Sequence, residues 1–371
     1  MKSGRAFVVA LLALAALNLA ACSSGSTNAR TIEVDFNSDD FAGSFLDYFP
    51  HDVTVRPGMT VNFHQTWTGA PHTVTFVDEN ELNTGSLPTF FRGGRTIGQD
   101  AAQPCYVKTL DALPADHAAC SKAHQVQPAF DGSYAYYSSG LIQPEGANAN
   151  RFSMKIAKNA KPGTYFYYCN LHGKPMSGHL TISATAPVKS QKELNRQGRA
   201  QAKQLSAPLL AEYRLEQAGK GKFTGNLAGS GDPSVQGAGA EINEFTPRTI
   251  YTNVGAKVSW TFVGNHSISF NVPSFTPLYK TLANGDIVVN NQLDGPAGGW
   301  PGAPPGHKPY PAISNEQVHL DAGNFDGSGG LKSSGVGFNS GDTFAVTFTK
   351  AGTYPYACLI HPGMIGKVVV K

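Results

Sequence analysis

Residues 163–178 read Gly-Thr-Tyr-Phe-Tyr-Tyr-Cys-Asn-Leu-His-Gly-Lys-Pro-Met-Ser-Gly, and residues 352–366 read Gly-Thr-Tyr-Pro-Tyr-Ala-Cys-Leu-Ile-His-Pro-Gly-Met-Ile-Gly. Each stretch runs from aromatic residues through Cys-x-x-His to Met-x-Gly. Upstream, Pro-His-Thr-Val-Thr-Phe at 71–76 matches Asn-His-Ser-Ile-Ser-Phe at 265–270. The chain therefore contains an internal repeat in which a His, a Cys, a second His and a Met recur in the same order.

The repeated residues form two candidate metal sites. Two imidazoles, one thiolate and one thioether are the donors of a type 1 (blue) copper site, whose axial Met is a weak, long ligand. Structural zinc and iron–sulfur sites do not normally use Met. A structural Cys beside a chance His is the alternative for one copy, and the duplication argues against it. The predicted ligands are His72, Cys169, His172 and Met176 in the first half, and His266, Cys358, His361 and Met364 in the second.

Each half resembles the cupredoxins, in particular plastocyanin, amicyanin and pseudoazurin. That family has one His on an early strand, followed by Cys-x-x-His and a Met on the loop between the last two strands. The resemblance covers about residues 31–183 and 241–371, and both halves carry an insertion between the first His and the Cys. It implies two type 1 copper ions per chain. It also implies single-electron transfer through an exposed imidazole, His172 or His361, in small, transient contacts with redox donor and acceptor proteins.

Alternating apolar residues predict an all-β fold of two Greek-key β-sandwich domains. Val61-Asn-Phe63 and Val258-Ser-Trp260 alternate in register, each after a turn at Gly58 or Gly255. Such a pattern is typical of half-buried antiparallel strands. The ligand loops then lie at one end of each sandwich, where a rigid scaffold holds them. The expected domains are residues 31–183 and 223–371, joined by a short basic, partly helical linker at 184–222.

The linker has its own composition. Between residues 187 and 222, eight Lys and Arg residues face three Glu residues. Leu194, Leu205, Leu209 and Tyr213 predict one or two short helices, interrupted at Pro208. Two interpretations of this positive charge remain open: a solvated spacer, or a segment that contacts anionic lipid headgroups.

The first 21 residues are expected to be a signal peptide. Lys2 and Arg5 precede an apolar run at 6–16, and Leu-Ala-Ala-Cys at 19–22 resembles a bacterial lipobox. In such signals Cys22 carries the lipid, and residues 22–30 then form a polar tether. An ordinary signal peptide with a coincidental Cys is the alternative. The expectation is an exported lipoprotein, anchored to a bacterial cell membrane and facing outside the cytoplasm.

The cysteine count leaves one pair without a role in lipid or metal binding. Of five cysteines, Cys105 and Cys120 remain. In an oxidising compartment we expect a disulfide between them, with two free thiols as the alternative. The net charge of +3 argues against a nucleic-acid partner.

Thr73 and Ser267 follow the upstream His residues of the two motifs. Their hydroxyls either brace the ligand loops or reflect the ordinary preference of Thr and Ser on a strand.

Three functions compete, and an electron carrier without enzymatic activity is the leading one. Multicopper oxidases and copper nitrite reductases need His-x-His pairs and a His beside the blue-copper Cys; Tyr168, Asn170, Ala357 and Leu359 flank the cysteines here. Copper storage or delivery favours clusters of exposed Met, and the chain has five Met in all. Histidines without a counterpart in the other half are expected to be non-ligands: His51, His64, His117, His124, His179, His307 and His319.

Overall fold

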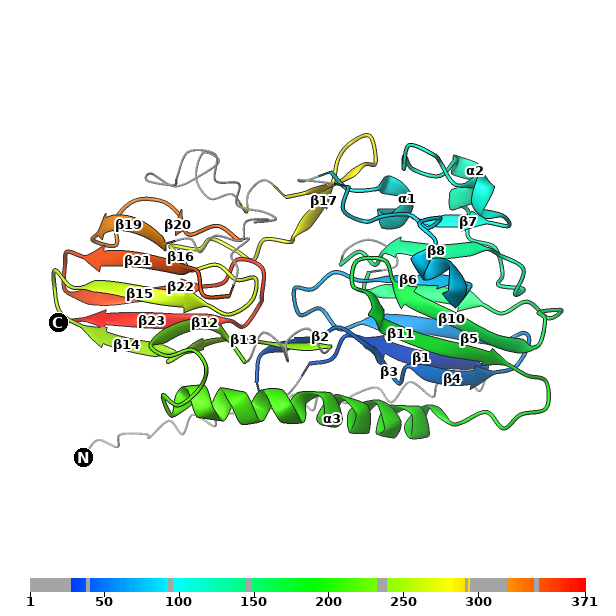
Figure 1. Ribbon diagram of the computed structural model, residues 1–371, viewed down its shortest axis with the longest axis horizontal. Coiled ribbons are helices and arrows are strands. Elements are labelled where there is room, and N and C mark those ends of the chain that lie inside the picture. Colours follow the sequence, from blue (N-terminus) through cyan, green and yellow to red (C-terminus); the bar gives the residue numbers. More distant parts are fainter. Residues whose placement is uncertain are drawn as a thin grey trace, which may run out of the picture.

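The computed structural model describes residues 28–37, 41–92, 96–144, 149–231, 239–290, 293, 319–336 and 340–371. The leader, the lipidation residue Cys22 and His307 lie outside these ranges. Two β-sandwiches stand side by side, and the long helix α3 runs beneath both (Figure 1). The predicted all-β class is confirmed.

The N-terminal sandwich consists of a four-stranded and a six-stranded sheet. Its core is aromatic: Tyr167 packs against Tyr48, Phe63 and Phe76, with ring centroids 4.9 to 5.3 Å apart. Such edge-on and tilted contacts add to the burial of the rings. The four-stranded sheet has the order β3 (Tyr48–Phe49), β1 (Ala29–Val34), β5 (Thr60–Gln65) and β9 (Arg151–Lys155). The six-stranded sheet has the order β4 (Asp52–Val55), β11 (Gly173–Ile182), β10 (Gly163–Cys169), β6 (Thr73–Val77), β8 (Tyr136–Leu141) and β7 (Cys105–Val107).

The C-terminal sandwich has a six-stranded and a five-stranded sheet, and the six-stranded sheet carries an additional strand at each edge compared with its four-stranded counterpart. Trp260 takes the central place in its core, and its indole N–H donates to the hydroxyl of Tyr356 at 3.2 Å. The six-stranded sheet has the order β19 (His319–Phe325), β21 (Thr343–Phe348), β15 (Lys257–Phe262), β12 (Asn226–Ser230), β13 (Ala240–Thr246) and β2 (Gly43–Phe45). The five-stranded sheet has the order β14 (Thr249–Thr252), β23 (Ile365–Val370), β22 (Gly352–Ala357), β16 (Ser269–Phe270) and β20 (Lys332–Ser333).

Strand β2 belongs to the second sandwich although it comes from the N-terminal part of the chain. It pairs antiparallel with β13, Phe45 opposite Ala240 and Gly43 opposite Ile242. Phe41, Phe45 and Phe49 then form an apolar cluster with residues of β13 and α3. The two halves therefore share a strand and a buried cluster between them.

Helix α3 differs from the short, interrupted helices that the sequence predicts. It is one helix, Gln191–Gln217, and it continues through Pro208. The side chain of Ser190 accepts the backbone N–H of Glu193 at its start, as an N-cap does. Pro208 is exposed, so water can hydrate the carbonyl that lacks a partner, and packing against both sandwiches outweighs the lost bond.

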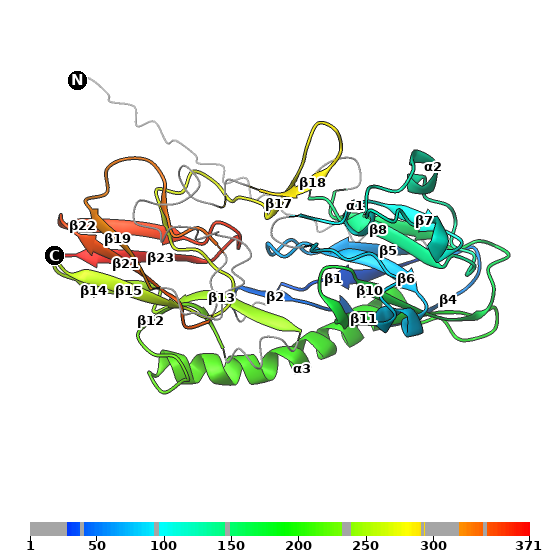
Figure 2. The same cartoon turned by 45° about the horizontal axis from the view of Figure 1, so that its top comes forward.

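The described parts of the insertions form short elements beside the sandwiches. Cys105 and Cys120 form a disulfide, with their Cα atoms 5.7 Å apart. Hairpin β17 (Tyr279–Thr281) and β18 (Ile287–Val289) reaches from the second half to α1 (Gln99–Ala102) in the first, as both views show (Figure 2). The remaining short helices are η1 (Glu79–Asn83), η2 (Leu110–Ala112) and α2 (Lys122–Gln125).

Two smaller points concern the segments outside the sandwiches. Ala29 and Arg30, at the end of the predicted tether at residues 22–30, pair with β5. Among the described helices, none is long and apolar enough to cross a membrane.

Candidate metal centres

The first ligand cluster lies at one end of the N-terminal sandwich. His72 directly precedes β6, and Cys169 ends β10. The turn into β11 then brings His172 back, so that the ligand atoms of these three residues lie within 4.8 Å of one another. His72 and Cys169 are buried and His172 is partly exposed. Met176, on β11, is buried in the same apolar cluster as Cys169.

The second cluster repeats the arrangement. His266, Cys358 and His361 have their ligand atoms within 4.8 Å, and all three are buried. The Nδ1 atoms of the two imidazoles point at each other, 3.0 Å apart. Met364 is fully buried beside Cys358 in the same apolar cluster, and its backbone N–H donates to the carbonyl of His361 at 3.1 Å. The shorter second loop therefore closes on itself with a backbone bond.

The unpaired atoms of these clusters fit a metal ion. Nδ1 of His72 is buried and has no hydrogen-bond partner within the described residues. At the second site, Nδ1 of His266 and Nδ1 of His361 face each other beside the buried thiol of Cys358, and a soft cation bound there would contact all three atoms. Among the residues that the structure describes, these two clusters are the groups of three or more His, Cys, Asp or Glu that could hold a metal ion.

Burial keeps the imidazoles in the form that binds a metal. It lowers the pKa of His72 to about 3. It lowers that of His266 to about 4, partly offset by a hydrogen bond to the backbone of Val263. Burial lowers the pKa values of His172 and His361 well below the usual range, and the neighbouring ligand His lowers each further. Neutral imidazole is the ligand species, so no proton has to leave these nitrogens before a cation binds.

A hydroxyl braces each ligand loop, as one of the two sequence interpretations expects. The hydroxyl of Thr73 accepts the backbone N–H of Asn170 at 2.7 Å, and its own backbone N–H points at the sulfur of Cys169 at 3.3 Å. At the second site, Ser267 accepts the N–H of Leu359 at 2.8 Å and points its own N–H at Cys358 at 3.4 Å. Burial raises the pKa of each thiol, and these N–H groups counteract that rise by stabilising the thiolate.

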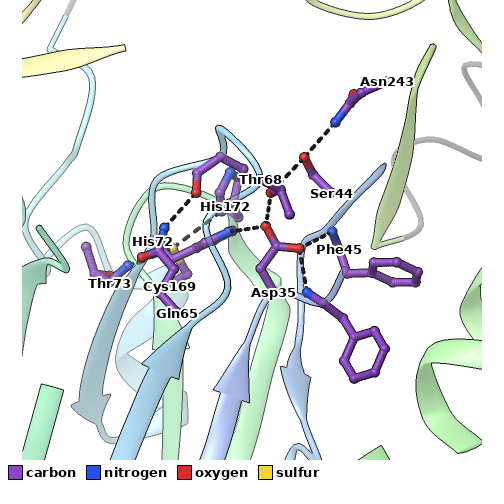
Figure 3. Close-up of polar contacts among 12 residues, drawn as sticks. Asp35, Ser44, Phe45, Gln65, Thr68, His72, Thr73, Cys169, His172 and Asn243 are labelled. Atoms are coloured by element: carbon purple, nitrogen blue, oxygen red, sulfur yellow. Dashed lines mark hydrogen bonds and ion pairs between the residues drawn. The ribbon is translucent and has the colours of Figure 1, made fainter. Parts of the chain in front are cut away.

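Asp35 is a residue of the first site that the motif search does not find. It is fully buried and its Oδ2 lies 3.4 Å from Nε2 of His72 (Figure 3). Its Oδ1 accepts the backbone N–H groups of Phe36 and Phe45, both at 2.6 Å, and Thr68 donates its hydroxyl to Oδ2. Burial raises the pKa of Asp35 to about 8, and the bonds from Thr68, Phe45 and Phe36 counteract this rise.

The loop that leads to His72 covers the second site. Gly69 has a φ of 106°, and a Cβ there would lie 2.0 Å from the carbonyl oxygen of Ile360 and 3.0 Å from the ring of His361. Trp67 packs edge-on against Phe275 beside this contact, with centroids 6.4 Å apart. The expectation of an exposed His361 is therefore wrong: its exposed fraction is 5%, because the other half of the molecule packs onto it.

Several of the remaining histidines have partners of their own. His64, His117 and His179 lie 2.7 to 3.1 Å from carboxylates, those of Glu33, Asp100 and Asp52 respectively. These three histidines lie outside the ligand clusters.

Comparison with known proteins points to copper. The model of the family "Copper binding proteins, plastocyanin/azurin family" matches residues 314–371. Among solved structures, a reduced amicyanin mutant is 18% identical over 33% of this chain and 70% of its own, with a TM-score of 0.18. Reduced auracyanin from the photosynthetic bacterium Roseiflexus castenholzii is 20% identical over 43% of this chain and 99% of its own, with a TM-score of 0.24.

The matched segment contains Cys358, His361 and Met364 together with the strands on either side of them. Copper is the metal that the description of this family names, and it is the metal that the donor set prefers. Residues 314–371 at the C-terminal end of the chain are therefore similar to the plastocyanin/azurin family of copper-binding proteins.

Proposed function

We propose that the protein is a blue copper electron carrier with two type 1 sites. The observation that carries the proposal is the pair of His-Cys-His clusters, whose cysteines are buried and which are each followed in the sequence by a buried Met. Copper, when bound, supplies reversible one-electron chemistry. The chain supplies a rigid ligand cage that needs little rearrangement when the charge changes. His72, Cys169, His172 and Met176 hold the first ion, and His266, Cys358, His361 and Met364 the second.

The exposure of the ligand residues supports an electron carrier that exchanges electrons with its partners mainly at the first site. His172 is partly exposed, and its imidazole edge can approach a partner protein. The donor and acceptor are redox proteins that make small, transient contacts with that surface. We propose no nucleic-acid partner and no enzymatic turnover.

Burial of the ligands also weighs against copper delivery. A protein that hands copper to a partner needs a labile, accessible site, whereas the thiols and the Met residues of both clusters are buried. A retained ion is what an electron carrier requires.

We further propose that the protein is exported and held on a bacterial cell membrane through a lipid on Cys22. The lipobox-like Leu-Ala-Ala-Cys at 19–22 supports the anchor. The disulfide Cys105–Cys120 supports an oxidising compartment. Replacing Cys22 with Ala should release the protein from the membrane fraction, because acylation is the strong apolar anchor that the sequence offers.

Copper stoichiometry and visible absorption test the central proposal. The loaded chain should hold two coppers and show an intense thiolate-to-copper band. Cys169→Ser and Cys358→Ser should each remove about half of the band and the double variant all of it. The matched control replaces Cys105 and Cys120 together with Ser and should keep both coppers. One copper in fully loaded protein would contradict the two-site proposal.

A further inference from the structure

We propose that Asp35 is a positioning residue for the first copper site, and that its carboxylate, acting through His72, gives this site a lower reduction potential than the second. This inference rests on the proposed function, and it assigns a direction to the flow of electrons between the sites.

The two halves have the same backbone at this point. The N–H of Thr66 donates to the carbonyl of Val34 at 3.0 Å, and the N–H of Val263 donates to the carbonyl of Ala228 at 2.8 Å. The residue after each acceptor has a left-handed backbone, with φ 66° at Asp35 and 86° at Gly229. Asp35 and Gly229 therefore occupy equivalent positions in the two sandwiches.

At the second site this position has no room for a side chain. A Cβ on Gly229 would lie 2.0 Å from the carbonyl oxygen of Val263 and 2.4 Å from Nε2 of His266. His266 instead forms a hydrogen bond with the backbone of Val263. Its imidazole thus faces a neutral peptide carbonyl.

At the first site a carboxylate takes the same place. Oδ2 of Asp35 lies 3.4 Å from Nε2 of His72. This separation is longer than an ordinary N–H···O bond, so the contact acts chiefly through charge, and a cation bound by His72 favours the ionised form of the Asp35 carboxyl group. A carboxylate behind a ligand imidazole raises its basicity, fixes its orientation and favours the more highly charged Cu(II). The first site should therefore hold an electron less tightly than the second.

Hydrogen-bond donors around Asp35 stabilise its carboxylate. A buried carboxylate without donors is costly, and a non-glycine residue in the left-handed region adds strain. Here two backbone N–H groups and the hydroxyl of Thr68 donate to Asp35. Thr68 also contacts the hydroxyl of Ser44, which accepts from the side chain of Asn243 at 2.8 Å (Figure 3). The network thus reaches the second half of the molecule.

The test is a redox titration of chains that keep one site. In the Cys358→Ser background, Asp35→Asn removes the charge and keeps the shape. We expect the first site to bind its electron about tenfold more tightly, about 59 mV for a one-electron couple. Copper affinity, measured by competition with a chelator, should fall about tenfold. In the Cys169→Ser background, the same substitution should leave the second site unchanged. A change below twofold in both quantities at the first site would overturn the inference.

Thr68→Val provides an independent variant with the same sign. It removes a donor that stabilises the carboxylate of Asp35, so the negative charge beside His72 is disfavoured and the first site should bind its electron about twofold more tightly. An unchanged or weaker electron affinity would count against Asp35, even if Asp35→Asn does not fold. The visible band of the parent chain distinguishes a failure of the proposed function from a failure of the inference about Asp35. A parent without two coppers refutes the proposed function, whereas a normal parent with unresponsive variants refutes only the role of Asp35.

Discussion

The two metal clusters have the same donors and the same hydroxyl brace, yet their surroundings differ. At the first, His72 faces the carboxylate of Asp35, and His172 is partly exposed. At the second, His266 bonds to a backbone group, and His361 is covered by the loop at Gly69. The donors select the metal, and the surroundings set the potential and the access. Duplicated motifs therefore need not be interchangeable sites, and each prediction below tests one part of this difference.

The largest effect is expected from a substitution that forces the two halves apart. Gly69→Ala places a methyl group against Ile360 at a left-handed backbone position. Backbone strain of about 1–2 kcal/mol combines with about 1–3 kcal/mol of overpacking. The free energy of unfolding should fall by the sum, and the exposure of His361 should rise. Thermal unfolding and hydrogen exchange at residues 359–361 measure the two results.

Gly255→Ala is the matched control for that substitution. Gly255 has a φ of 81° and nothing within 4 Å of the added methyl group. It should show the backbone strain alone and leave the exchange at 359–361 unchanged. Equal destabilisation by the two variants would mean that the contact between Gly69 and Ile360 contributes nothing.

The next effect concerns access from solution. In the Cys358→Ser chain the remaining first site has a partly exposed His172, whereas the Cys169→Ser chain retains only a site with a buried His361. A protein-sized reductant such as reduced cytochrome c should reduce the first site at least tenfold faster, about 1.4 kcal/mol in barrier height. Ascorbate, which is small, should discriminate less. Stopped-flow absorbance at the thiolate band measures both rates, and equal rates with the cytochrome would remove the distinction in access.

A smaller and symmetric effect is expected at the hydroxyl braces. Thr73→Val and Ser267→Ala each remove the acceptor of one loop N–H and leave the ligands in place. Copper affinity should fall by up to about tenfold at the altered site only, because groups that orient ligands contribute that much. Unequal losses would show that the braces, besides Asp35, contribute to the difference between the sites.

The smallest effect concerns the interface between the halves. Burial raises the pKa of Glu241 to about 7, and the nearby Asp35 adds to the rise. The folded chain then holds a proton that the unfolded chain releases above about pH 4.5, so stability falls as the pH rises from about 4.5 to about 7. Glu241→Gln should remove this loss, and its advantage in Tm over the parent should grow by a few degrees across that range.

Glu79→Gln is the control for the pH series. Glu79 is exposed and pairs with Lys174, which lowers its pKa. Its substitution should change Tm slightly and in the opposite direction. A Glu241→Gln advantage that does not vary with pH would exclude this carboxylate as its source.

The sequence was sufficient for the fold class and for locating the residues of the two His-Cys-His clusters. Cys169, His172 and Met176 are close in the chain, and the repeat supplies a second copy of each. The disulfide could be inferred from the cysteines that remain. These features are local or duplicated, so pattern and chemistry locate them.

Features that depend on packing between the halves could not be read from the sequence. Asp35 is a lone acid with no repeated counterpart, since the other half has Gly229 in its place. The cover over His361 requires knowledge of where Gly69 lies. The sequence around Pro208 predicted a break in the helix. In the structure, contacts with both sandwiches stabilise α3 as one helix, and local helix propensity does not include such contacts.

The shared strand has a consequence for the order of folding. The backbone N–H of Ala42 bonds to the side chain of Glu244, 202 residues later in the chain. Contacts between such distant residues form late, because closing so long a loop costs conformational entropy before the contact can stabilise the fold. The N–H of Phe45, on the strand that docks, is also a donor to Asp35. We therefore expect the first metal cluster to form last, when the newly made second half pairs with β2, although its own residues are synthesised first.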